Sequence, residues 1–298
     1  MTVAVTAEAV KLLRERTGAG MMECKKALVQ AGGDLEAAAE IMRKSGLAKA
    51  DKKAGRVAAE GVIAIERAAD GRSAAVVEIN SETDFVAREV DFRAFASGVA
   101  RAALDARPPD LAALAAVRLP SGQTVEGTRR ELVARIGENI GVRRFERIES
   151  AGPLGTYLHG TRIGALVALD GGDEGLARDL AMHVAAINPQ YVTADDVPAE
   201  QVAKEREIFL AQIASDPKAQ GKPADIVAKM VDGKLRKYLS EITLTGQPFV
   251  KDDKLAVAEV LKRGKARVLR FARYEVGAGI EKKQGNFAAE VMAQVRGA

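Results

Sequence analysis

The sequence has little of several residue types on which common classes of protein depend. Among its 298 residues are one cysteine, Cys24, two histidines and no tryptophan. A single cysteine cannot form a disulfide within the chain, which excludes an oxidised scaffold held together by disulfides. Together with the histidines it supplies three ligands, one fewer than a closed zinc site of cysteine and histidine requires.

Long apolar runs are also missing. No stretch approaches the ~20 uncharged apolar residues of a membrane-spanning helix. The first residues lack the basic start and the apolar stretch of a signal peptide. We therefore expect a protein of the cytoplasm, or at least of a reducing compartment, with no membrane partner.

The length of the chain predicts about two domains. Its charged residues are distributed unevenly between the N-terminal segment and the rest of the chain. Residues 1–56 contain 11 Lys and Arg against 7 Asp and Glu, which accounts for the whole formal net charge of +4. Much of the excess lies in residues 43–56, which could contact nucleic acid. A solvated linker is the favoured interpretation, because aromatic residues for stacking on bases make up only 4% of the chain.

Apolar spacing predicts three short helices within the first 46 residues. Thr6 is placed to cap the first helix, and Asp34 is placed to cap the third. The third helix is expected to end at Ser45-Gly46, because glycine commonly terminates helices. The chain is thus interpreted as beginning with a small helical module followed by a basic linker.

Strand-like and helical segments alternate after this linker. The runs Gly61–Ile65 and Ala74–Ile79 flank Asp70-Gly71, which is a hairpin turn signal. A second pair of strands, Leu154–His159 and Ile163–Leu169, is also followed by a helix. The recurring order indicates an internal duplication of a hairpin-plus-helix unit, although residue identity between the copies is weak.

Two further helices are predicted inside the second copy. Residues 198–214 and 224–242 carry apolar stripes with helical spacing and are joined by a loop that contains Pro217 and Pro223. This pattern predicts an antiparallel helical hairpin that could project from the core.

The sequence contains no motif that points to catalysis. The three Gly-Lys pairs are not followed by the Ser or Thr that a Walker phosphate loop needs for magnesium. Cys24 is expected to be a buried, inert thiol and His183 a packing residue, whereas His159 is expected at an exposed corner. We therefore expect a protein that is not an enzyme and binds no cofactor, metal or nucleotide of its own.

The segment Thr83-Asp84-Phe85-Val86 has two interpretations. In the first, Thr83 or Asp84 caps the following helix and Phe85 packs beneath it. In the second, Phe85 is an exposed wedge, whose burial in a partner yields ~1.5–3 kcal/mol, and Asp84 brings a carboxylate to that partner. The residues alone leave both interpretations open.

Five stretches of the chain, in this order, resemble one protein family. They are Leu13–Leu28, Glu82–Ala87, Ile136–Ile140, Ala181–Ala186 and Leu244–Phe249. The family is bacterial and organellar translation elongation factor Ts, the guanine-nucleotide exchange factor for elongation factor Tu. Ser81 stands where a cysteine is common in the family, and this small replacement puts little in doubt.

The resemblance implies an α+β fold with a defined division of the chain. Its expected parts are a three-helix module similar to ubiquitin-associated domains (1–46), a basic linker (47–57), two related α+β core subdomains (58–150 and 151–280) and a C-terminal module (281–298). The second subdomain would contain the helical hairpin at about 197–243.

The resemblance also implies a site for elongation factor Tu. Thr83, Asp84, Phe85 and Val86 correspond to the segment that intrudes beside the nucleotide site of elongation factor Tu and helps to dislodge magnesium. Further partner contacts are implied for Arg14, Met21, Met22 and His159. The implied activity is release of GDP from elongation factor Tu so that GTP can rebind.

Three matters stay open on the sequence. The chain could act as a homodimer or in a complex with two copies of each partner. It could instead be an RNA- or ribosome-associated protein that binds through Lys52, Lys53 and Arg56 of the basic linker. A hydrolase that uses His159 with a carboxylate is the weakest alternative.

Overall fold

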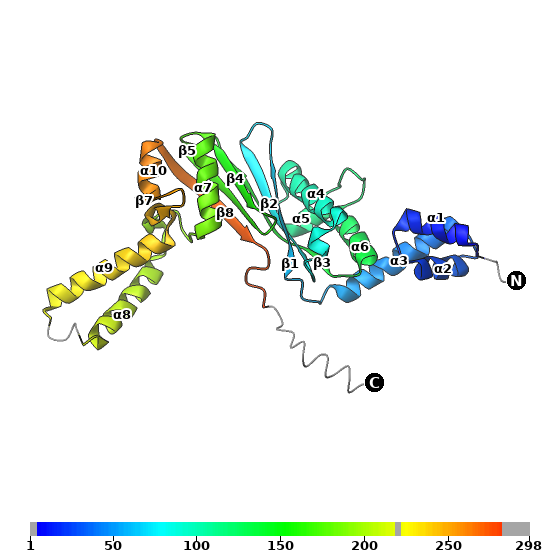
Figure 1. Ribbon diagram of the computed structural model, residues 1–298, viewed down its shortest axis with the longest axis horizontal. Helices are drawn as coiled ribbons and strands as arrows, with labels where there is room; N and C mark the ends of the chain where they lie inside the picture. Colours follow the sequence, from blue (N-terminus) through cyan, green and yellow to red (C-terminus); the bar gives the residue numbers. More distant parts are fainter. Residues whose placement is uncertain (1–4, 218–221, 282–298) are drawn as a thin grey trace. The chain divides into compact units, whose positions relative to one another are not determined.

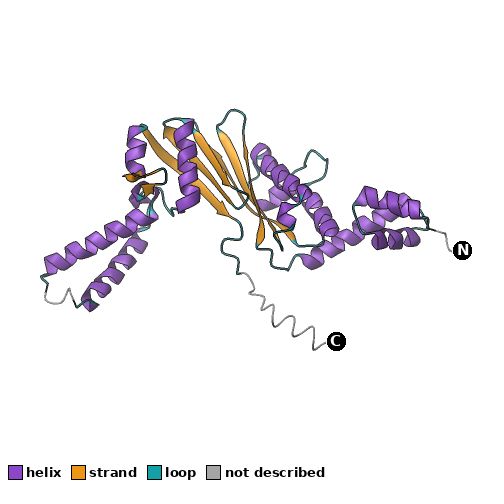
Figure 2. Ribbon diagram, viewed as in Figure 1, coloured by secondary structure: helices purple, strands orange, loops and turns teal. Residues whose placement is uncertain are grey.

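The computed structural model describes residues 5–217 and 222–281 and combines helices with β-sheets, in agreement with the predicted α+β class (Figures 1 and 2). The chain forms two compact units. The described part of the first unit is 5–66, 75–146 and 275–281, and that of the second unit is 67–74, 147–217 and 222–274. The expected boundaries of the five parts stay predictions, and the expected C-terminal module lies, after its first residue, outside the described residues.

Three helices begin the first unit, as predicted: α1 (Ala7–Thr17), α2 (Met21–Gln30) and α3 (Leu35–Lys53). The Thr6 hydroxyl caps α1 by accepting a hydrogen bond from the Ala9 N–H at 3.2 Å. Leu13, Cys24 and Leu28 are buried between the helices. The prediction of a buried Cys24 is therefore confirmed.

The predicted end of the third helix at Ser45-Gly46 is wrong, because α3 continues to Lys53 through most of the expected linker. Gly46 is buried, and a Cβ atom at this position would lie 2.9 Å from the Ala134 side chain of α6. Gly46 thus allows two helices to approach closely instead of ending one. The residues that follow it, 47–53, include no glycine or proline to stop the helix.

The first sheet has the strand order β1-β2-β3 and contains the predicted hairpin. Its strands are β1 (Glu60–Arg67), β2 (Ser73–Ser81) and β3 (Ile140–Glu149). Three helices pack on one another beside this sheet: α4 (Val90–Ala106), α5 (Leu111–Ala116) and α6 (Val125–Ile136) (Figure 1). Helix α4 is the predicted helix that follows the Thr83–Val86 segment, whereas α5 was not predicted and has only six residues.

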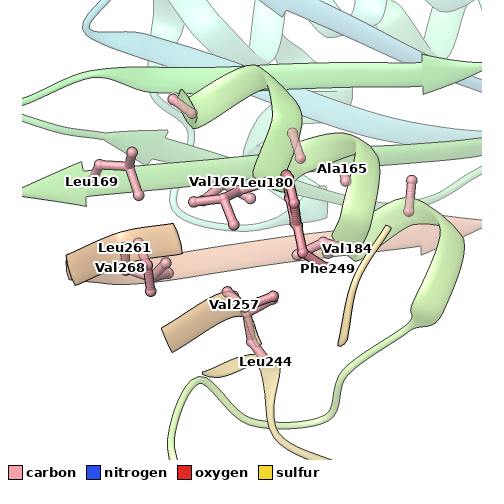
Figure 3. Packing of buried hydrophobic residues seen from close by; sticks show 13 residues of the cluster. Ala165, Val167, Leu169, Leu180, Val184, Leu244, Phe249, Val257, Leu261 and Val268 are labelled. Atoms are coloured by element: carbon pink, nitrogen blue, oxygen red, sulfur yellow. The ribbon is translucent and has the colours of Figure 1, made fainter. Parts of the chain in front are cut away.

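The second sheet repeats the hairpin-plus-helix order and has the strand order β4-β5-β8. It is formed by β4 (Leu154–His159), β5 (Ile163–Gly171) and β8 (Ala266–Glu275), and α7 (Glu174–Ile187) packs on β4 and β5. The predicted pairing of β4 with β5 is confirmed, with partners from Leu154 and Ala168 to His159 and Ile163. Figure 3 shows the core of this unit, in which Val167, Leu180 and Val184 meet Phe249 and Val257.

Several short elements of the second unit were not predicted from the sequence. They are β6 (Pro248–Phe249), β7 (Asp252–Ala256), α10 (Val257–Arg263) and the 3₁₀ turns η2 (Ala194–Asp196) and η3 (Leu244–Gly246). With the exception of α10, each has five residues or fewer, which is too short for a periodic apolar pattern to stand out.

The predicted helical hairpin is present as α8 (Ala199–Ser215) and α9 (Ala224–Ile242). It has a small core of its own, in which Ile213 and Val231 are buried against neighbours that include Phe209. No helix in the part of the chain that the structure describes is long and apolar enough to cross a membrane.

A fully buried carboxylate connects three segments of the first unit. Glu78 of β2 accepts hydrogen bonds from Arg143 (3.0 Å) and Arg144 (2.6 Å) of β3 and from the Gly277 N–H (2.8 Å). Asn80 of β2 donates a fourth hydrogen bond at 3.0 Å. Burial alone would raise the pKa of Glu78, but these hydrogen bonds outweigh it and hold the pKa below its ordinary value of 4.5.

We predict that Glu78→Gln lowers the free energy of unfolding by about 1–3 kcal/mol, because buried donors lose their charged acceptor. The carboxylate contributes stability fully above its unfolded pKa, and that contribution is lost as the pH falls through the lower folded pKa. Urea unfolding followed between pH 7 and pH 3 should therefore show a weaker acid dependence for the variant than for the unmodified chain.

Glu174→Gln is the matched control, since it removes an exposed carboxylate that contacts Arg67 at 2.9 Å. This change should lower the free energy of unfolding by less than about 1 kcal/mol. Equal effects of the two substitutions would contradict a stabilising role for Glu78.

Candidate functional site

The segment Thr83–Val86 lies in the connection between β2 and α4, and only one of its residues, Phe85, is classed as exposed. Phe85 is 74% exposed, and it directly precedes the 3₁₀ turn η1 (Val86–Arg88). No side chain caps η1, and none caps α4, which begins after Glu89. The interpretation in which Phe85 packs beneath a helix capped by Thr83 or Asp84 is therefore wrong. The physical reason is that Val86 and Ala87 occupy the buried positions of the turn, and Phe85 is left outside.

Val86 has a different environment from its neighbour Phe85. It is only 5% exposed, so its side chain belongs to the interior of this chain. The sequence pattern could not separate the two residues, because both are apolar and adjacent. In the structure, Val86 anchors the loop and Phe85 is presented by it.

Thr83 is held by hydrogen bonds within the chain. Its N–H donates to one carboxylate oxygen of Glu138 at 2.9 Å, and its hydroxyl donates to the other at 2.7 Å. The Thr83 carbonyl oxygen accepts a hydrogen bond from the Ser81 hydroxyl at 2.9 Å. These partners fix the backbone of the loop two residues before Phe85.

Asp84 presents its carboxylate beside Phe85 at the surface. Its Oδ2 atom is 2.7 Å from Nη2 of Arg88, one helical turn further along the chain. Both side chains are about half exposed or more, so this ion pair contributes only about 0–1 kcal/mol to stability. The Asp84 carboxylate can therefore leave Arg88 at little cost and contact a cation or a donor on another molecule.

The other expected contact residues lie elsewhere in the chain. Arg14 on α1 and Met21 and Met22 at the start of α2 are exposed. His159, at the end of β4 in the second unit, is exposed as predicted, and its Nδ1 atom lies 3.4 Å from the Tyr157 hydroxyl.

Sequence reasoning missed two exposed apolar residues in the N-terminal helices. Leu12 of α1 and Val29 of α2 are large apolar side chains, and both are exposed. Leu12 directly precedes the buried Leu13 and thus points about a quarter turn away from it. Only a stricter test of helical spacing could have found this difference.

The buried histidine, His183, has a structural role. His183 is fully buried, its Nε2 atom lies 3.0 Å from the Gln247 side-chain oxygen, and its Nδ1 atom accepts a hydrogen bond from the Val250 N–H. Burial lowers the pKa of His183, which favours the neutral ring. In the described ranges, no group of three or more His, Cys, Asp and Glu could hold a metal ion.

The basic residues considered for nucleic acid are partly occupied by the chain itself. Lys53 at the end of α3 donates a hydrogen bond to the Gly137 carbonyl oxygen. Arg56 lies 3.5 Å from the Glu82 carboxylate, although its side chain is more than half exposed.

Comparison with known proteins gives a consistent result. A family model described as Elongation factor TS matches residues 82–278. The chain is 60% identical to Elongation factor Ts of Alkalilimnicola ehrlichii over 296 residues, which cover 99% of this chain and 100% of the relative. It is 59% identical to Elongation factor Ts of Halorhodospira halophila, with 99% of both chains covered. It is 56% identical to Elongation factor Ts of Legionella pneumophila (strain Paris), with 98% of this chain and 99% of the relative covered.

We predict that Phe85→Ala changes the free energy of unfolding by less than about 0.5 kcal/mol, because the ring is mostly in solvent already. The matched control is Phe92→Ala on α4, which removes a fully buried ring and should cost about 3–5 kcal/mol. Denaturant unfolding of both variants measures the difference. A comparable loss for Phe85→Ala would show that this ring supports the fold.

Proposed function

The chain belongs to the elongation factor Ts family, and on this premise we propose that it is a guanine-nucleotide exchange factor. In this proposal it binds elongation factor Tu that carries GDP, dislodges the magnesium ion and promotes GDP release, so that GTP can rebind during translation elongation. The observation that carries the proposal is an exposed Phe85 beside an exposed carboxylate, Asp84, on a loop fixed at both ends.

Nucleotide exchange depends on the coupling between two binding events on the partner, that of the nucleotide and that of the exchange factor. A factor that stabilises the nucleotide-free form of its partner weakens nucleotide binding by the same ratio by which nucleotide weakens binding of the factor. Each tenfold acceleration of release requires a barrier lower by ~1.4 kcal/mol. An acceleration of several decades therefore needs several contacts.

Phe85 can provide part of this free energy. Burial of its exposed ring in the partner yields ~1.5–3 kcal/mol, which corresponds to about one to two decades in rate. The ring can displace a helix of the partner and so distort the loop that holds the phosphates. In the free chain the exposed ring gives little stability, which leaves its burial energy available for binding.

Asp84 can act on the magnesium ion. Magnesium prefers oxygen ligands, and it offsets the negative charge of the phosphates that it bridges. A carboxylate brought beside its coordination shell competes for the ion or for its water ligands. Loss of the ion then weakens the hold of the partner on the diphosphate.

The remaining free energy is expected from a broad interface. The exposed Met21 and Met22 with Arg14 offer an apolar patch and a cation on the N-terminal helices. His159 would contact the partner from the second unit. In the loop itself, Thr83 and Val86 act by holding the backbone, because both are engaged inside this chain.

We predict that Phe85→Ala lowers the maximal rate of GDP release about ten- to a hundredfold, as expected for the loss of ~1.5–3 kcal/mol. The measurement is the release of a fluorescent GDP analogue from elongation factor Tu as the concentration of the factor is raised. Leu111→Ala on α5 is the control, since it also truncates an exposed apolar side chain and should release the analogue at the unmodified rate.

Three outcomes are distinguishable in this experiment. Slow release with Phe85→Ala alone supports the wedge. Fast release with both variants retains the exchange function but moves its free energy to other contacts. No acceleration by the unmodified chain contradicts the proposed function, and binding to RNA that weakens steeply with salt would then favour the alternative through the basic segment.

A further inference from the structure

The turn between α6 and β3 is bound to the loop that presents Phe85. Helix α6 ends at Gly137, whose φ of 89° lies in the left-handed region, and the Gly137 N–H donates to the Val133 carbonyl oxygen at 2.9 Å. Glu138 and Asn139 follow at once and lead into β3. The position of the Glu138 backbone is therefore set by the end of one helix and the start of one strand.

Hydrogen bonds run in both directions between this turn and the loop. Glu138 accepts two hydrogen bonds from Thr83, and the Asn139 N–H in turn donates to the Glu82 carboxylate at 2.6 Å. The consecutive residues Glu138 and Asn139 thus bind the consecutive residues Glu82 and Thr83, which lie more than 50 positions earlier in the sequence. The loop backbone cannot rotate at Thr83 without breaking more than one of these bonds.

We infer that Glu138 is a positioning residue for the exchange site, an inference that rests on the proposed function. Its carboxylate holds Thr83 and so fixes the direction in which Asp84 and Phe85 leave the protein. Glu138 acts through Thr83 and does not itself need to contact the partner. A wedge that must enter a partner in one orientation loses rate when its support is loose, since small misplacements cost up to about a hundredfold.

Glu138 is a cleaner probe of this arrangement than its neighbour Asn139. The Asn139 side chain donates to the Arg56 carbonyl oxygen at 2.7 Å and to the Ala54 carbonyl oxygen at 3.3 Å. Its substitution would therefore also release the segment that follows α3. The hydrogen bonds of Glu138 described here all go to the loop residue Thr83.

We predict that Glu138→Ala lowers the maximal rate of GDP-analogue release about tenfold, with a smaller change in the concentration of factor that gives the half-maximal rate. Glu138→Gln should lie between Glu138→Ala and the unmodified chain, because the amide oxygen still accepts one hydrogen bond. Glu131→Ala is the matched control: it removes an exposed carboxylate of α6 that accepts from Gln123 at 2.6 Å, and it should have no effect.

A second measurement tests, in the absence of any partner, whether Glu138 holds Thr83. The Thr83 amide is protected by its bond to Glu138, so Glu138→Ala should speed its hydrogen exchange by NMR about tenfold or more in the free full-length chain. Unchanged protection of the Thr83 amide would overturn the inference. If Glu138→Ala does not fold, Glu138→Gln provides a milder test: it keeps the size of the side chain but replaces a charged acceptor with a neutral one, so exchange of the Thr83 amide should still be faster than in the unmodified chain.

A double variant tests whether Glu138 acts through Phe85. In the Phe85→Ala background, Glu138→Ala should cause a clearly smaller loss of rate than in the unmodified chain, because one of the two groups that it positions is already absent. Losses that multiply in the double variant would overturn the inference. If the unmodified chain accelerates release and Glu138→Ala matches it, the inference alone fails, whereas no acceleration by the unmodified chain defeats the proposed function as well.

Discussion

The site depends on one reciprocal set of hydrogen bonds, between Glu82-Thr83 at the end of β2 and Glu138-Asn139 between α6 and β3. Each pair supplies a carboxylate and a backbone N–H to the other. Asn139 extends the set to the carbonyl oxygen of Arg56, and so to the chain that follows α3. The end of one strand, the end of one helix and the exit from the N-terminal helices are thus fixed at one place. Charge-assisted hydrogen bonds are short and directional, which suits them to hold a loop whose tip is in solvent.

This arrangement separates the residues that support the loop from those that it presents. Thr83 and Val86 have their polar or apolar groups satisfied inside the chain, whereas Asp84 has only an exposed ion pair with Arg88 and the Phe85 ring is mostly in solvent. An exposed ring adds little to folding, so the stability of this unit must come from elsewhere. The packed helices and the buried Glu78 network supply it, which leaves the surface of the loop free for a partner.

The sequence predicted best those elements whose signals are local. The β4–β5 hairpin and helix α7 followed from strand and helix periodicity, and the α8–α9 hairpin from two apolar stripes on either side of a proline-containing loop. Gly46 was misread because a glycine that ends a helix and a glycine that admits a neighbouring helix look the same locally. Its neighbour Ala134 is 88 positions away, and nothing in the local pattern reveals it.

The candidate site shows the same limit at the level of single residues. The resemblance located the whole segment from Thr83 to Val86, but it could not distinguish residues that touch a partner from residues that hold the loop. That distinction depends on burial and on Glu138, which lies 55 positions from Thr83. The residues of a motif shared by a family therefore have two kinds of role. Exposed residues supply the contacts with the partner, and buried residues fix the direction in which the exposed side chains point. Substitution of a contact residue or of a supporting residue would reduce activity. The two roles are separated by measurements on the free chain, because the hydrogen bonds that hold the loop can be followed there without a partner.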